Sequence, residues 1–188
     1  MWKYLGNHPT LPILVVSALL AFFSLRIQRK LARAKNSIDL QNNYLASERM
    51  HALMVNVAAV AKHKDAKWLA ELAEIDTLDG QPEDKVKAIK DIRIVLNAFE
   101  RVSIGVDSKV YDEKLLFRSY RGFVIDTHTK LYPYIKEKQE DGRYYNHFCQ
   151  MAERWCELDK EKQEPVYFWS IKGMIRVVAK KFKNWLRC

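Results

Sequence analysis

The side chains best suited to chemistry in this 188-residue chain are five histidines and three cysteines. Their spacing is not that of a metal site, because no two histidines stand four apart and no two cysteines are separated by only two residues. Asp126 and His128 stand two apart, so on one helix their side chains point in different directions. The glycine-rich loops that bind phosphates or dinucleotides are absent from the sequence. The sequence therefore predicts no metal, no cofactor and no catalytic residue.

The cysteines indicate the compartment. Cys149, Cys156 and Cys188 are few and odd in number, whereas the disulfide framework of a secreted domain is denser and usually even. This pattern favours a reducing compartment. Cys149 and Cys156 stand seven apart, nearly on one helix face, as small packing residues do.

One polar group in the middle of the chain could form a site. Asn97 and Glu100 stand three apart and share a helix face, with Arg101 beside them and Arg93 within reach. Two interpretations are open: a polar functional site, or a buried hydrogen-bonded network that holds this helix against its neighbours. We favour the network. Replacing Asn97 by leucine separates the two, since a network loses stability whereas a site loses only function.

The elements that must position these residues begin with an apolar segment. Leu11–Leu25 is uncharged and almost wholly apolar; as a helix it reaches about 22 Å. Pro9–Ile27 reaches about 28 Å, close to the roughly 30 Å hydrocarbon layer of a bilayer. A cleaved signal peptide carries its positive charge before the apolar run, whereas here the cations follow it. The sequence predicts an uncleaved transmembrane helix within an anchor at residues 1–30.

Charge predicts the orientation of that helix. The side chains expected at the membrane surface are Trp2 on the near side and a basic group beyond the apolar run, namely Arg26, Arg29, Lys30 and Arg33. By the positive-inside rule, the N-terminus lies outside and residues 26–188 lie in the cytoplasm.

The net charge of +9 is concentrated at the two ends of the chain. Residues 1–35 and 166–188 each hold six basic side chains and no acidic one, whereas the region between them holds 20 basic and 23 acidic side chains. A nucleic-acid-binding domain normally carries its basic patch on the folded body. We therefore expect the lipids of an anionic leaflet as partners, and no nucleic acid.

The last segment has two opposite faces. Its apolar face includes Trp185, and its basic face is formed by Lys172, Arg176, Lys180 and Lys183. This pattern predicts a basic amphipathic helix at residues 161–188 that lies in the membrane interface. The alternative left open is that its apolar face docks on the domain.

Long stretches without glycine or proline predict an all-α fold, with a compact helical domain at residues 31–160 between the anchor and the last helix. The apolar spacing predicts one unbroken helix from Arg26 to about Lys64, or a chain that folds back at residues 35–37. Pro82 is expected at the first position of a helix that ends near Gly105. Asp112 is expected to cap the next helix.

Four groups of residues carry a resemblance to a known family: Leu96-Asn97-Ala98-Phe99-Glu100, Ile104-Gly105, Tyr111-Asp112-Glu113 and Glu153-Arg154-Trp155. In these the chain resembles the bacterial and prophage family catalogued as domain of unknown function 4760, over roughly residues 35–158. The resemblance implies an N-terminal hydrophobic helix, a basic flank and a compact all-helical domain. It implies no activity.

Together these features predict a membrane-tethered helical binding or regulatory protein of the bacterial inner membrane, with a protein partner or a second copy of itself. The habitat implied by the resemblance makes phage exclusion or host defence the expected setting. The alternative is a lipid-proximal enzyme that uses Asn97, Glu100 and Arg101.

Overall fold

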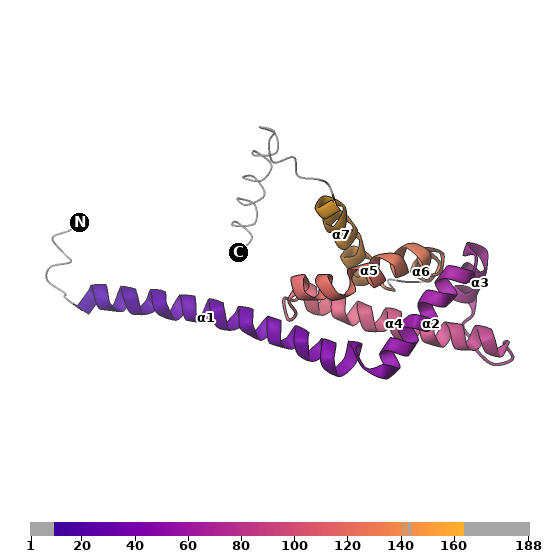
Figure 1. Cartoon of the computed structure of the whole chain (residues 1–188), viewed down its shortest axis with the longest axis horizontal. Coiled ribbons are helices and arrows are strands. Elements are labelled where there is room, and N and C mark those ends of the chain that lie inside the picture. Colours follow the sequence, from indigo (N-terminus) through magenta and orange to yellow (C-terminus); the bar gives the residue numbers. More distant parts are fainter. Residues whose placement is uncertain (1–9, 141, 143, 164–188) are drawn as a thin grey trace, which may run out of the picture.

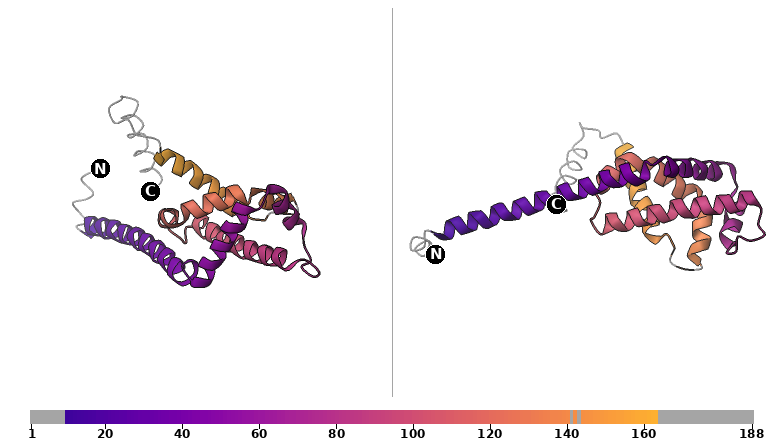
Figure 2. Two further views of the ribbon diagram at one scale, coloured as in Figure 1. Left: turned by 45° about the vertical axis from the view of Figure 1, so that its right-hand side comes forward. Right: turned by 90° about the horizontal axis from the view of Figure 1, so that it is seen from below.

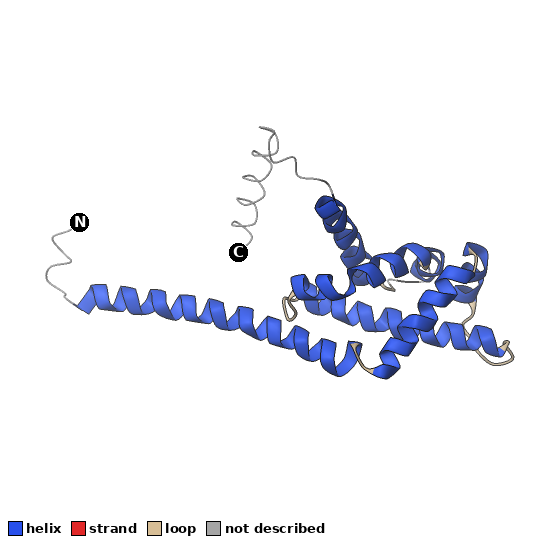
Figure 3. Cartoon of the chain, in the orientation of Figure 1, coloured by secondary structure: helices blue, strands red, loops and turns tan. Residues whose placement is uncertain are grey.

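The computed structural model describes residues 10–140, 142 and 144–163, and every regular element in this part of the chain is a helix (Figure 3). The all-α expectation is confirmed for these residues. In order, the elements are α1 (Thr10–Leu40), a π-helical turn (Gln41–Leu45), α2 (Glu48–His63), α3 (Ala66–Glu74), α4 (Glu83–Asp107), α5 (Glu113–Lys130), α6 (Tyr132–Glu140) and α7 (Asn146–Gln163) (Figure 1).

The first half of α1 projects away from the domain formed by α2 to α7 (Figures 1 and 2). Its large apolar side chains between Ile13 and Leu25 are 52% to 66% exposed. Among the described residues, no helix combines the length and the apolar character needed to cross a membrane.

The chain breaks its helix between α1 and α2 at a place that the apolar spacing did not indicate. The expected unbroken helix over residues 26–64 is wrong, and so is the alternative of a fold-back at residues 35–37, which lie inside α1. The π-helical turn leads to Ser47, whose hydroxyl caps α2 by accepting a hydrogen bond of 3.3 Å from the Met50 backbone N–H. The turn brings Leu45 and Met50 into the core, where they are 2% and 3% exposed. Burial of these two side chains against the rest of the domain explains the break.

The other helix starts follow local capping signals. The Asp65 carboxylate accepts a 2.7 Å hydrogen bond from the Trp68 N–H at the start of α3. Asp112 caps α5 as expected, accepting from the Lys114 N–H at 2.9 Å. Pro82 lies one position earlier than expected, at the cap of α4 rather than at its first residue.

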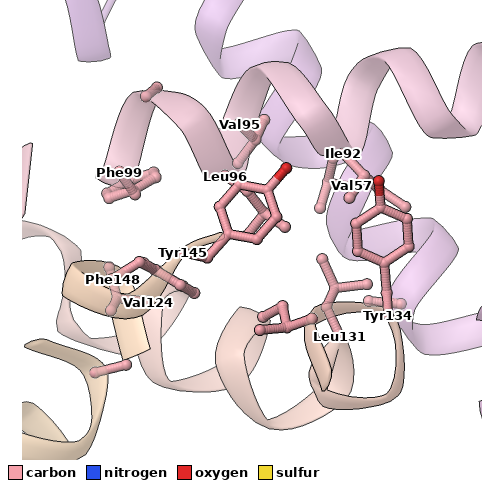
Figure 4. Close-up of a cluster of buried hydrophobic side chains, with 14 of the residues drawn as sticks. Val57, Ile92, Val95, Leu96, Phe99, Val124, Leu131, Tyr134, Tyr145 and Phe148 are labelled. Carbon is pink, nitrogen blue, oxygen red and sulfur yellow. The ribbon is translucent and has the colours of Figure 1, made fainter. Parts of the chain in front are cut away.

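Helix α4 is central to the domain. It packs against α2 on one side and α7 on another, while α3 packs against α6 and α5 against α7. The core between these helices is continuous, and Figure 4 shows the part of it where α4 meets the segments that follow α5. Its largest fully buried side chains include Trp155, Tyr134, Phe99 and Phe148.

Candidate functional site

The end of α4, the start of α5 and the first ten residues of α7 contribute to one cluster of polar side chains. We call it the Arg154 cluster; it consists of Asp107, Glu113, His147, Arg154 and Trp155. The Arg154 guanidinium donates to Asp107 Oδ1 at 3.0 Å and to Glu113 Oε1 at 3.3 Å. The Trp155 indole N–H donates to the same Glu113 oxygen at 3.1 Å. The second Asp107 oxygen lies 3.1 Å from His147 Nδ1. One residue of α7 thus joins both acids, and the cluster ties three helices together.

The charges of the Arg154 cluster are only partly screened from water. The side chains of Asp107, Glu113 and Arg154 are between 32% and 40% exposed, so each ion pair contributes at most about 1 kcal/mol. Arg154 places one planar guanidinium between two carboxylates, a geometry that a lysine cannot reproduce. Within the described part of the chain, no hydroxyl or thiol is hydrogen-bonded to the His147 ring. The arrangement is one that orients helices.

Glu100 lies beside this cluster and caps α7 from outside. The cap position of α7 is Tyr145, whose backbone C=O accepts from the Cys149 N–H at 3.0 Å and whose side chain is a poor cap. The Glu100 carboxylate of α4 accepts instead from the backbone N–H groups of His147 at 3.3 Å and Phe148 at 2.7 Å. The carboxylate thus gives a hydrogen-bond acceptor to two backbone N–H groups that have no partner within α7. Its negative charge also stabilises the positive end of the helix dipole.

The other two residues of the expected polar group lie elsewhere. Asn97 and Arg101 are exposed on α4, whereas Glu100 is half-buried and turned toward α7. Among the described residues no hydrogen bond joins Asn97 or Arg101 to Glu100. The structure therefore does not bring the three side chains together in one hydrogen-bonded group: Glu100 belongs to a network, and its two neighbours face solvent.

A second junction fastens α1 to the domain. Ser37 is fully buried; its hydroxyl donates to the Arg33 C=O at 3.0 Å and accepts a 2.7 Å hydrogen bond from the Asp112 N–H. One residue earlier, the Asn36 amide donates to the Val110 C=O at 3.3 Å. The turn between α4 and α5 is thereby held against α1, next to the Arg154 cluster.

Burial shifts the pKa of several ionisable groups inside the domain. It lowers the pKa of His128, and the nearby Glu153 carboxylate partly opposes this effect. It raises the pKa of Cys149 to about 11, so this thiol stays protonated at neutral pH and acts as a packing residue. In the described part of the chain, no three His, Cys, Asp or Glu side chains are grouped so that they could hold a metal ion.

The expected membrane contacts divide between described and undescribed residues. Arg26, Arg29 and Lys30 are exposed along α1, and Arg33 is half-buried where α1 meets the domain. The remaining ones lie outside the described residues: Trp2, Lys172, Arg176, Lys180, Lys183 and Trp185. The expected amphipathic helix at residues 161–188 also falls almost wholly outside them.

The family described as "Domain of unknown function (DUF4760)" matches residues 11–155, which is most of the chain. This chain belongs to the DUF4760 family. Neither a curated protein nor a solved structure matches it.

Several of the residues by which the sequence resembles the DUF4760 family lie close together in the structure. Glu100 caps α7, while Glu113, Arg154 and Trp155 form most of the Arg154 cluster. At Gly105 the structure requires a glycine, because a Cβ there would overlap the ring of Tyr111. Glu100, Glu113 and the Arg154-Trp155 pair, which follows Glu113 by about 40 positions, thus build one corner of the domain.

Sequence reasoning missed three contributors to this corner. The sequence singled out neither Asp107 nor His147, and Ser37 was expected only as part of a place where the chain could fold back. Each acts through a partner at least 40 residues away in the chain. No local signal marks such a partnership.

Proposed function

We propose that this protein is a membrane-tethered helical binding module, held to the bilayer by the apolar half of α1. The observation that carries the proposal is the uncovered apolar surface of that helix. A helix that is apolar all round is normally buried in protein or in lipid, yet nine large apolar side chains between Ile13 and Leu25 are at least half exposed. At about 1.5 kcal/mol or more for each, removing them from water is worth more than about 10 kcal/mol.

The side chains that follow the apolar half support contact with anionic lipid. Arg26, Arg29 and Lys30 occupy little more than one helical turn and are exposed. Each cation near an anionic leaflet adds about 1 kcal/mol at best. Their position after the apolar run favours a single crossing with the N-terminus outside and the domain in the cytoplasm.

The junction between α1 and the domain supports a tether that fixes distance. Because Ser37 and Asn36 fasten the α4–α5 turn to α1, the domain cannot drift freely from the anchor. In the proposed arrangement it stays about 18 Å from the end of the apolar run, as the rise of a helix over the twelve positions from Leu25 to Ser37 sets. A rigid tether suits a module that meets its partner at the membrane surface.

Fractionation of cells without detergent tests the tether. The expected result is that the protein stays with membranes after an alkaline wash and that Leu19→Arg/Phe22→Arg moves it to the soluble fraction. Leu31→Arg/Ile38→Arg is the matched control, since both residues are exposed on α1 outside the apolar run. Recovery of the unaltered protein in the soluble fraction would overturn the proposal.

Orientation needs a separate measurement. Protease added to sealed cells from outside should remove an N-terminal epitope tag and leave the domain intact. If both ends are protected together while the protein still sediments with membranes, the chain is anchored without crossing, and the single-pass part of the proposal is wrong.

A further inference from the structure

One face of α4 is left uncovered by the described part of the chain. It is formed by six exposed residues, which we call the α4 stripe: Lys87, Lys90, Ile94, Asn97, Arg101 and Ile104. Their spacing alternates between three and four residues, so they lie along one side of the helix. Ile94 and Ile104 are 37% and 43% exposed, although both belong to the residue types that are most often buried.

The other sides of α4 are occupied by the domain. Ile92 and Phe99 are buried in the core, and Glu100 bonds to α7. Arg93 donates to the Ile75 C=O, which follows α3, at 2.9 Å. The α4 stripe is the side of α4 that the described part of the domain does not cover. It extends along most of α4, the longest helix of the domain.

The chemistry of the α4 stripe is that of a helix-pairing seam with a positive charge. Alternating spacings of three and four residues are those of the core positions of a coiled coil, where apolar residues pack and a single asparagine sets the register. Here two isoleucines lie about 15 Å apart along the helix, with Asn97 between them. The six residues hold three cations and no acid, and exposed Glu83, one turn before Lys87 on the same face, leaves a net charge of +2 along this side of the helix. Asp91, next to it, is already hydrogen-bonded to the Asn56 amide at 3.1 Å.

We propose that the α4 stripe binds an amphipathic helix of another protein, one that carries acidic side chains beside its apolar seam. This deepens the proposed function by naming the surface with which the module binds its partner, and it rests on that proposal for the binding role alone. The isoleucines supply apolar contact, and the cations select an acidic partner and speed its approach.

Charge and geometry argue against three other occupants. A second copy of this chain would bring three cations against three, which is unfavourable. Residues 166–188 carry six basic side chains and no acid, so the same repulsion applies to them. A bilayer is also a poor fit, because α4 runs roughly antiparallel to α1 (Figures 1 and 2). With α1 inserted, the stripe extends away from the lipid surface.

A binding measurement on the full-length protein in detergent micelles tests the proposal. The probes are two synthetic helical peptides with the same leucine and isoleucine seam, one flanked by glutamates and the other by lysines, followed by fluorescence anisotropy. We expect the acidic peptide to bind more tightly. Ile94→Ala/Ile104→Ala should weaken it by about tenfold or more, and Lys87→Glu/Lys90→Glu/Arg101→Glu should reverse the preference.

The matched control changes three exposed cations elsewhere on the domain, in Lys114→Glu/Arg118→Glu/Lys136→Glu. It should keep the preference for the acidic peptide. Equal binding of both peptides, or equal loss in the control, would overturn the proposal. Sedimentation that shows a dimer abolished by Ile94→Ala/Ile104→Ala would overturn it in favour of a second copy.

Photocrosslinking in cells identifies the occupant. A photoreactive phenylalanine analogue at position 97 should crosslink to an acidic amphipathic helix of another protein, and the same analogue at position 136 should not. A crosslink to lipid, to this chain itself or to nothing would contradict the proposal. Membrane fractionation of the same cells reports on the tether independently, so failure of the stripe and failure of the anchor are distinguishable.

Discussion

The hydroxyl of Ser37, in the projecting helix α1, accepts a 2.7 Å hydrogen bond from the backbone N–H of Asp112, 75 residues later in the chain. Asp112 in turn caps α5 with its carboxylate. One buried hydroxyl thereby links the helix that we propose as the anchor to the first turn of α5, where Glu113 enters the Arg154 cluster.

Ser37→Ala should destabilise the protein by about 1–3 kcal/mol, because the Asp112 N–H loses its acceptor in a partly buried place. Urea denaturation of the full chain measures the loss, and hydrogen exchange at Asp112 should become faster. Thr129→Ala is the control, since that exposed hydroxyl donates to the Ile125 C=O of its own helix. If the two substitutions reduced the free energy of unfolding equally, the Ser37–Asp112 hydrogen bond would not be what stabilises the junction between α1 and the domain.

Glu100→Ala should cost about 1–2 kcal/mol, since two backbone donors of α7 lose their cap and the helix dipole loses its counter-charge. Glu100→Gln keeps an acceptor without the charge and should cost less. Asn97→Ala, at an exposed position of the same helix, should change the free energy of unfolding by less than about 0.5 kcal/mol. Thermal melts that place Asn97→Ala beside Glu100→Ala would show that Asn97 belongs to the same stabilising network.

Gly105→Ala and Gly122→Ala should have opposite effects. A Cβ at Gly105 would overlap the Tyr111 ring, whereas nothing lies within 4 Å of a Cβ at Gly122. We expect a loss of about 1–3 kcal/mol at the first position from overpacking and a gain of about 0.5–1 kcal/mol at the second from helix propensity. Adding Tyr111→Ala to Gly105→Ala should cost less than the two single losses together. Additive losses would show that the loss at Gly105 does not come from contact with the Tyr111 ring.

Stability should fall as the pH is lowered from about 7 to 5, because burial lowers the pKa of His128 in the folded state. Below the ordinary histidine pKa of about 6.5, the unfolded chain therefore binds more protons at His128 than the folded chain does. The stability that the neutral, half-buried His128 contributes is present above this pKa and is lost as the pH falls below it. Melting temperatures across this range measure the slope. His128→Phe should flatten it, and an unchanged slope would assign the effect to another group.

Much of the secondary structure could be predicted, because its signals are local. Asp112 caps the helix that it was expected to cap, and α4 ends within two residues of the expected Gly105. The apolar run at Leu11–Leu25 is evident in the sequence, and the structure adds that, within the described part of the chain, its large apolar side chains from Ile13 onward are more than half exposed. The break after Leu40 could not be predicted, since it depends on where Leu45 and Met50 pack.

The candidate site was only half visible in the sequence. Glu100 was singled out with Asn97 and Arg101 because the three are close along one helix, but a helix turns its side chains by about 100° per residue. Glu100 faces α7 and the other two face solvent. The assignment of Glu100 to a network and of Asn97 to an exposed stripe needed the position of α7.

By itself the sequence determined the all-α class, the Asp112 cap, the apolar segment and the basic residues after it, because each depends on neighbours within a few positions. Only the tertiary structure decided which partner each polar side chain meets. Ser37, Glu100 and Arg154 all act on residues more than 40 positions away, and such contacts are fixed by the burial of the whole core rather than by any local pattern.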